Sequence, residues 1–158
     1  MRYGQTWSGN GGAPEGVERH CPVLWRDFET GPGLYDFGRI AKMLAAQAGP
    51  VHLQIVISMY GRETGLVDYT PACHKRSLKL TAANGKVGEI PNYADPEWCA
   101  AYWRAGAELA GWCRGNERVA GFQVALGLNQ ETQATAITAD GSNWHQPAAQ
   151  LLDEEGYY

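Results

Sequence analysis

The clearest pattern along the chain is a near-continuous apolar run, VHLQIVISM, at residues 51–59. Only three polar residues interrupt it, which is typical of a strand covered on both faces, as strands in parallel sheets are. A second run, RVAGFQVALG at residues 118–127, predicts another buried strand, and a shorter apolar run at residues 23–25 predicts a third.

Two amphipathic patterns lie between these strands. Apolar residues at helical spacing predict a helix over residues 37–48. Asp95 as N-cap, with Pro96 at the first helical position, predicts the start of a second helix that extends to about Cys113. Residues 60–93 form a long stretch whose TP, NG and IPNY segments indicate loops.

The order of these elements is strand, helix, strand, long loop, helix, strand. This βαβαβ series predicts an α/β fold with a parallel sheet and right-handed crossovers. In such folds, ligands bind at the carboxyl ends of the strands. Polar or aromatic side chains follow all three predicted strands, in the segments Trp25-Arg26-Asp27, Ser58-Met59-Tyr60 and Asn129-Gln130-Glu131. The sequence therefore predicts a binding site at this edge of the sheet.

Composition and charge describe an ordinary globular chain with a single domain over residues 1–158. It is 44% hydrophobic and 19% charged, and its net charge of -4 comes without a basic stripe, so we expect no nucleic-acid partner. No apolar run approaches the roughly 18 residues that span a bilayer, so we expect no membrane partner. The first residues lack the pattern of a signal peptide, which predicts a cytoplasmic location if Met1 is the natural start.

The cysteines are Cys21, Cys73, Cys99 and Cys113, and none are spaced as a CxxC pair. We therefore expect no metal, although the adjacent Cys73-His74 is a weak metal cue, and buried free thiols are the simpler interpretation. The chain has no GxSxG, P-loop or GxGxxG motif, and we expect no cofactor. Six Trp and eight Tyr against three Phe favour a surface that stacks on ligands such as sugars, although protein cores use these rings too.

Two segments carry a resemblance to a known family. WRDFETGPGLYDFGRIAKML, residues 25–44, resembles a stretch of the (β/α)8 glycoside hydrolases of the retaining, β-galactosidase-like type that reads W-x-D-x-E-P-x-x-G-x-Y-D-F before a helix. IPNYADPEWCAAYWRAGAELAGWCRGNERVAGFQVALGLNQET, residues 90–132, resembles the third helix and fourth strand of the same barrels. The resemblance covers most of residues 22–132. Because such a barrel needs about 250 residues, it implies a partial (half) TIM (β/α)8 barrel that corresponds to the N-terminal half.

The resemblance implies a glycoside hydrolase-like protein that acts on carbohydrate. By position, Glu131 matches the acid/base that protonates the leaving oxygen and then activates water. This chemistry needs a second carboxylate about 5 Å away as the nucleophile, which in these barrels comes from strand seven. At the predicted strand ends, Asn129, Trp25, Tyr60 and Arg26 are expected to contact the substrate.

Simpler interpretations stand beside these assignments. Glu131 fits a solvated turn, Trp25 a buried core position and Arg26 a surface ion pair. Glu29, in the first motif, is expected to bridge a loop rather than to act in catalysis. The alternative function is a non-catalytic carbohydrate-binding or assembly protein on the same half-barrel, and a third interpretation is a small α/β protein whose resemblance is accidental.

Half of a barrel would leave open strand edges and uncovered apolar surface, both of which are liabilities in water. We therefore expect the chain to form a homo-oligomer or to pair with a complementary barrel half.

Overall fold

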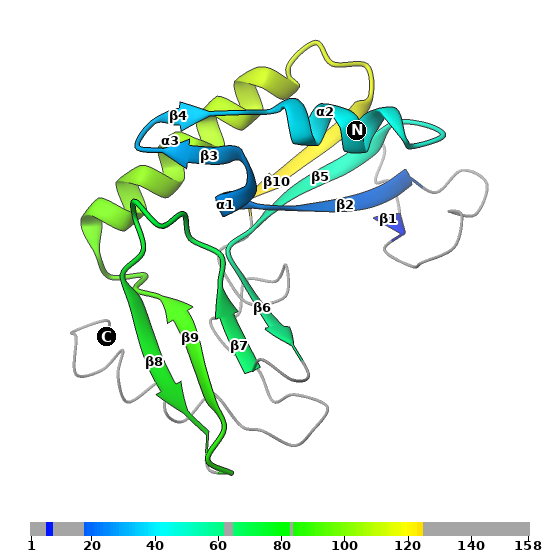
Figure 1. Ribbon diagram of the computed structural model, residues 1–158. Coiled ribbons are helices and arrows are strands. Elements are labelled where there is room, and N and C mark those ends of the chain that lie inside the picture. Colours follow the sequence, from blue (N-terminus) through cyan, green and yellow to red (C-terminus); the bar gives the residue numbers. More distant parts are fainter. Residues whose placement is uncertain (1–5, 8–17, 62–64, 83, 125–158) are drawn as a thin grey trace.

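The computed structural model describes residues 6–7, 18–61, 65–82 and 84–124 (Figure 1). Its centre is a parallel sheet in which the strand order is β1-β2-β5-β10. These strands are β1 (Thr6–Trp7), β2 (Glu18–Leu24), β5 (Val51–Val56) and β10 (Val119–Val124).

The predicted parallel pairing of the three apolar strands is confirmed. β2 pairs with β5 in parallel, from Arg19 opposite Val51 to Leu24 opposite Val56. β10 pairs with the other side of β5, also in parallel, and its register shifts once near Gly121. The carboxyl ends of all three strands therefore meet at one edge of the sheet.

Three helices occur in the described part of the chain, α1 (Trp25–Phe28), α2 (Gly38–Ala45) and α3 (Pro96–Cys113). The predicted start of α3 is confirmed, because Asp95 Oδ1 accepts the backbone N–H of Glu97 at 2.8 Å and that of Trp98 at 3.3 Å. α2 is shorter than predicted, and α1 is a single turn directly after β2. None of these helices is long and apolar enough to cross a membrane.

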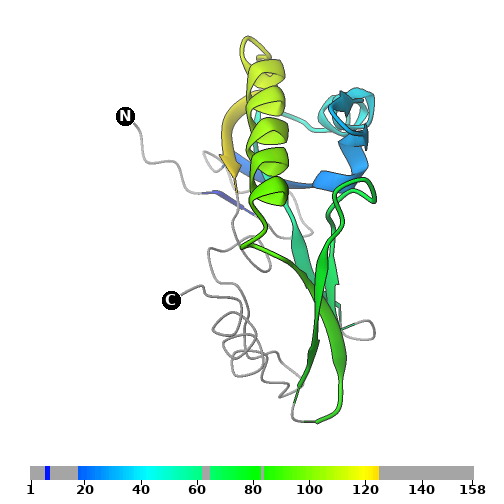
Figure 2. The ribbon, with the colours of Figure 1, turned by 90° about the vertical axis from the view of Figure 1, so that its left-hand side faces the viewer.

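The main core lies between the sheet and the helices α2 and α3 (Figure 2). Alternate residues of β5, Val51, Leu53 and Ile55, are wholly buried in the same cluster as Leu44 of α2 and Leu109 of α3. Since successive side chains of a strand point to opposite faces, both helices cover the face of the sheet that carries these three residues.

The predicted fold class, a parallel βαβαβ series forming half of a TIM barrel, is wrong. The segment predicted to be a long loop folds into two antiparallel hairpins that extend from the sheet (Figure 1). One consists of β6 and β7 and the other of β8 and β9, and a third small ribbon, β3 with β4, follows α1. These strands are β3 (Glu29–Gly31), β4 (Leu34–Tyr35), β6 (Ser58–Gly61), β7 (Gly65–Asp68), β8 (Ser77–Thr81) and β9 (Val87–Pro91).

The physical reason for this difference lies in turn chemistry and in local apolar spacing. Asn84-Gly85 is a hairpin signal, and Gly85 takes φ 81°, which glycine adopts without strain. Leu80 and Ile90 face a second core cluster between the hairpins and are buried. The described residues therefore form a mixed fold, in which antiparallel hairpins extend from a parallel sheet, and not half of a barrel (Figure 1).

The two hairpins touch so closely at Gly88 that a side chain has no room there. A Cβ at this position would lie 2.7 Å from Leu66 Cβ and 2.9 Å from the Leu66 backbone N. In contrast, a Cβ at Gly111, on the exposed side of α3, would meet nothing within 4 Å.

We predict that Gly88→Ala lowers the free energy of unfolding by about 1–3 kcal/mol, because backbone atoms must shift to admit the methyl group. Gly111→Ala, the matched control, should raise it by about 0.5–1 kcal/mol, because alanine loses less conformational entropy in a helix. Urea unfolding followed by circular dichroism measures both. Equal stability of the two variants would contradict the packing of the hairpins described above.

Candidate functional site

Glu29 lies where α1 passes into β3, and its carboxylate is buried with a residue exposure of 3%. Oε2 accepts the indole N–H of Trp25 at 2.6 Å, and Oε1 accepts the backbone N–H of Gly33 at 3.0 Å. A third contact comes from a distant loop, since His74 Nε2 lies 2.8 Å from Oε1. Burial of a carboxylate is tolerated only with such partners, so this cluster of donors is what holds Glu29 inside the protein.

His74 belongs to the loop between β7 and β8, and its position is fixed on two sides. Its ring stacks on that of Trp25 with centroids 5.7 Å apart and planes inclined by 19°. Its backbone N–H donates to the carbonyl of Pro71 at 2.9 Å. Because an ionised carboxylate can only accept, Nε2 is the donor of this contact in the tautomer that pairs with ionised Glu29.

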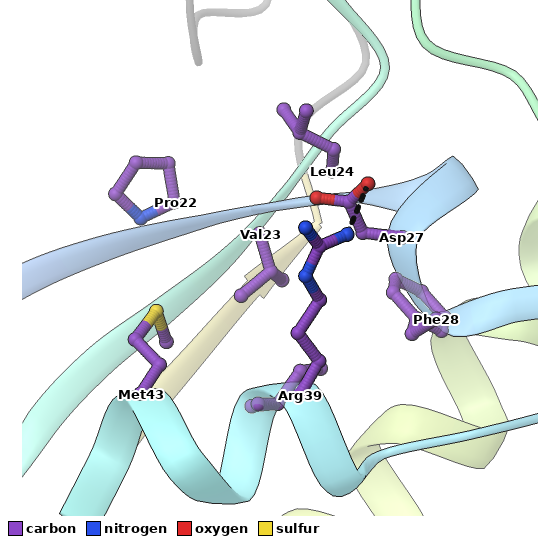
Figure 3. A pocket seen from close by; sticks show the side chains of 8 residues that line it. Pro22, Val23, Leu24, Asp27, Phe28, Arg39 and Met43 are labelled. Atoms are coloured by element: carbon purple, nitrogen blue, oxygen red, sulfur yellow. Dashed lines mark ion pairs between the residues drawn. The ribbon is translucent and has the colours of Figure 1, made fainter.

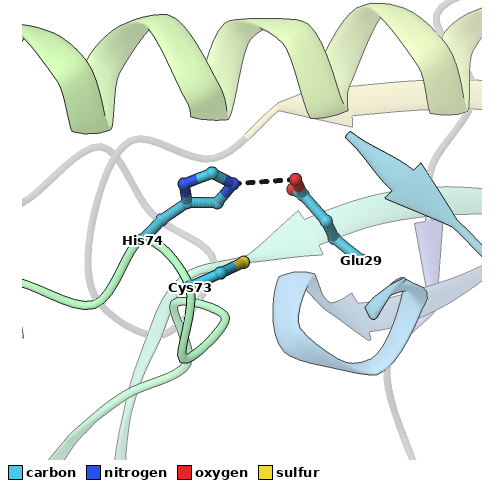
Figure 4. A group of neighbouring side chains, drawn as sticks. All are labelled: Glu29, Cys73 and His74. Atoms are coloured by element: carbon cyan, nitrogen blue, oxygen red, sulfur yellow. Dashed lines mark hydrogen bonds and ion pairs between the residues drawn. The ribbon is translucent and has the colours of Figure 1, made fainter. Parts of the chain in front are cut away.

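Cys73 precedes His74 and brings an exposed thiol to the same carboxylate (Figure 4). The donor atoms of Glu29, Cys73 and His74 all lie within 4.8 Å of one another. Partial burial, and then the negative charge of Glu29, raise the pKa of the Cys73 thiol above its ordinary value. A raised pKa favours the neutral thiol, whereas activated cysteine nucleophiles have a lowered pKa.

A pocket of about 580 Å³ adjoins Glu29, and we refer to it as the polar pocket. Tyr69 links the strand ends beside it, because its N–H donates to the carbonyl of Ile57 at 2.7 Å and its carbonyl accepts the N–H of Arg26 at 3.0 Å. The pocket therefore lies near the carboxyl edge of the parallel sheet. Its lining residues are Arg26, Asp27, Glu29, Thr30, Asp68, Thr70, Pro71, Ala72 and Lys75.

Every carboxylate in this lining already has a partner. Asp68 is buried and accepts the N–H of Thr70 at 2.8 Å and the hydroxyl of Ser77 at 2.6 Å. Asp27 forms an ion pair with Arg39 at 3.1 Å. With Glu29 also engaged, each of the three carboxylates in the lining has at least one partner within the protein.

The cationic lining groups are more accessible than the acidic ones. The guanidinium of exposed Arg26 lies 4.4 Å from the centroid of the Tyr69 ring, a cation–π contact that orients it along the pocket wall. Lys75 is exposed and its Nζ lies 2.9 Å from a carboxylate oxygen of Glu89. Neither contact is buried, so both cations can also donate to a bound ligand.

A second pocket, of about 200 Å³, lies between β2, α1 and α2 (Figure 3). The ion pair between Asp27 and Arg39 joins the two helices beside it. Its remaining lining is apolar and consists of Pro22, Val23, Leu24, Phe28, Ile40 and Met43. Because ligand pockets are usually larger, about 300–1,000 Å³, the polar pocket is the better candidate site.

The structure brings together two of the residues that the sequence predicts for substrate contact. Trp25 and Arg26 both lie beside Glu29, but Trp25 is wholly buried and only Arg26 lines the polar pocket. Tyr60 lies in the hairpin strand β6, where its backbone pairs with Leu66. The predicted catalytic residue Glu131 and its neighbour Asn129 lie outside the described residues.

Sequence reasoning did not identify Glu29, His74 and Asp68 as members of a site. Glu29 was expected to have a structural role, which its hydrogen bonds to Trp25 and Gly33 support. The only local signal for His74 was its position after Cys73. Its contact with Glu29 spans 45 positions of the chain, so spacing rules cannot reveal it.

Comparisons of this chain with models of protein families, with curated protein sequences and with solved structures find no match.

Proposed function

We propose that this chain binds carbohydrate in the polar pocket. The observation that carries the proposal is the pocket itself, which is about 580 Å³ in volume and in which seven of the nine lining residues carry hydrogen-bonding side chains. This volume lies within the range of sites that hold small ligands. The resemblance of residues 25–44 to carbohydrate-active barrels supports the same ligand class.

The charge of the lining favours a polyhydroxylated, uncharged ligand. Three carboxylates, two cations and two threonines contribute to the wall. Sugar hydroxyls both donate and accept, so they can use carboxylate oxygens and cationic N–H groups in the same site. A phosphate would meet unfavourable charges of its own sign at the three carboxylates.

Binding is better supported than hydrolysis by the described residues. The lining carboxylates are held in hydrogen bonds and ion pairs, whereas a retaining glycosidase needs an acid/base and a nucleophile about 5 Å apart. Hydrolysis is the second candidate function, and the position of Glu131 in the segment that resembles glycoside hydrolases supports it.

We predict that Arg26→Ala weakens binding of a cognate glycan by about 10-fold, because it removes a charged hydrogen-bond donor from the pocket wall. A glycan array identifies the ligand, and titration calorimetry measures its dissociation constant. Arg114→Ala, an exposed arginine at the end of α3, is the control and should bind as the parent does. Absence of binding to any glycan, or equal affinity of the Arg26 variant, would reject the polar pocket as a carbohydrate site.

If the chain hydrolyses aryl glycosides, we predict that Glu131→Gln reduces turnover by about 100-fold or more, the usual effect of losing a general acid. Release of nitrophenol from nitrophenyl glycosides measures it, and Glu117→Gln provides an exposed control. Glycan binding without any turnover in the parent would leave carbohydrate binding as the function and remove hydrolysis. Equal turnover in the Glu131 variant would remove its catalytic assignment.

A further inference from the structure

Glu29, Cys73 and His74 place three metal-ligating atoms at one point of the structure (Figure 4). The carboxylate comes from the junction of α1 and β3, and the thiol and imidazole come from the loop before β8. All three donor atoms lie within 4.8 Å of one another. We propose that these three residues form a binding site for a divalent transition metal ion, with Zn²⁺ as the best match.

The donor set selects this class of ion. Zn²⁺ binds cysteine sulfur, histidine nitrogen and carboxylate oxygen in mixed combinations. Mg²⁺ and Ca²⁺ prefer sets made of oxygen alone, so a thiol and an imidazole disfavour them. The combination of one oxygen, one nitrogen and one sulfur ligand therefore points to zinc or to a chemically similar ion such as Co²⁺.

The spacing of the donors is close to what zinc requires. Ligand bonds of about 2.0–2.3 Å in a tetrahedron set the donor atoms roughly 3.5 Å apart. Glu29 Oε1 and His74 Nε2 are 2.8 Å apart, and no pair among the three exceeds 4.8 Å. Entry of the ion then needs His74 Nε2 and Glu29 Oε1 to separate by roughly 0.7 Å, and it needs the exposed side chain of Cys73 to close in by up to about 1.3 Å.

Binding replaces the hydrogen bond between His74 and Glu29 with coordination to the ion. The imidazole proton moves from Nε2 to Nδ1, so that the Nε2 lone pair faces the metal, and the thiol of Cys73 releases its proton to solvent. The hydrated ion releases water ligands to solvent as its bonds to the three side chains form. The negative charges of Glu29 and of the Cys73 thiolate balance the two positive charges of the ion.

The surroundings already hold two of the three ligands in place. The indole N–H of Trp25 fixes Glu29 Oε2, and the Trp25 ring stacks on His74. Outer partners of this kind orient metal ligands and increase their affinity. Within the described residues the site has three protein ligands, one fewer than tetrahedral zinc takes, which is the pattern of zinc sites that bind an exchangeable fourth ligand.

The metal site goes beyond carbohydrate binding and does not depend on it. Glu29 also lines the polar pocket, so the ion would lie beside a bound ligand. The absence of a CxxC pair led us to expect no metal, because spacing rules register only ligands that are close in sequence. Here Glu29 and His74 are 45 positions apart.

The test is titration of the full chain with Co²⁺ after removal of metals by a chelator. We expect a single Co²⁺ per chain, a thiolate-to-cobalt charge-transfer band, visible bands of tetrahedral cobalt, and displacement of all of these by Zn²⁺. Cys73→Ser should abolish the charge-transfer band and weaken binding by about 10-fold or more, and His74→Gln should weaken it to a similar degree. Cys99→Ser is the matched control, because the Cys99 thiol lies outside the cluster and donates a hydrogen bond to the carbonyl of Tyr93. This variant should bind Co²⁺ as the parent does.

Circular dichroism of the metal-free variants establishes whether each is folded. If the Cys73 variant does not fold, the loss of binding is measured on the His74 variant alone. Absence of Co²⁺ and Zn²⁺ binding at about 100 μM ion would overturn the proposal. So would unchanged binding in folded Cys73 and His74 variants, or a loss in the Cys99 variant equal to that in the Cys73 variant. Failure of glycan binding alone would affect the carbohydrate proposal and leave the metal site standing.

Discussion

The cost of burying a carboxylate must be offset by hydrogen-bond donors, and the surroundings of Glu29 supply them. Its two oxygens accept hydrogen bonds from the Trp25 indole, the Gly33 backbone and the His74 ring. The first two partners lie in α1 and in the turn between β3 and β4, and the third attaches the loop before β8. Removal of any partner would leave negative charge in a poorly solvated place, so the three contacts act together. They hold the Glu29 carboxylate, which lines the polar pocket and also belongs to the proposed metal site.

Aromatic packing extends this arrangement into the core. The Trp25 ring contacts Trp98 and Tyr102 of α3, with centroids 5.6 Å and 5.1 Å away. The indole N–H of Trp98 in turn donates to the hydroxyl of Thr70, 2.9 Å away, at the edge of the pocket. The rings of Trp25, Trp98 and Tyr102 are thus used to join α3 to the strand end and the loop, and not as a surface for stacking on ligands.

Local signals predicted the parts of the fold that depend on neighbouring residues. The start of α3 follows from Asp95 and Pro96, and the parallel pairing of β2, β5 and β10 follows from buried apolar runs separated by helices. The hairpins were missed because the stretch from 60 to 93 reads as a series of turns. The strands between those turns are short, and their apolar residues are buried only because the two hairpins pack on each other.

The candidate site was predictable only in part, for a related reason. Arg26 directly follows β2, as the apolar run at residues 23–25 indicates, and it lines the polar pocket, whereas its contact with a ligand stays a prediction. The partnership of Glu29 with His74 depends on how the loop before β8 returns to α1, and no local pattern encodes that return. Glu131, on which the hydrolytic interpretation depends, lies outside the described residues, so the structure adds nothing to its assignment.

The most direct test of this account is the coupling energy between Glu29 and His74. A double-mutant cycle with Glu29→Gln, His74→Gln and the double variant, unfolded in urea with a chelator present, isolates their interaction from any bound metal. The account predicts that Glu29→Gln costs about 3 kcal/mol of stability, as expected when a buried pair is broken. It also predicts a coupling energy of about 1 kcal/mol or more between the two residues. Effects that add to within about 0.3 kcal/mol would contradict the account, because the two side chains would then act independently.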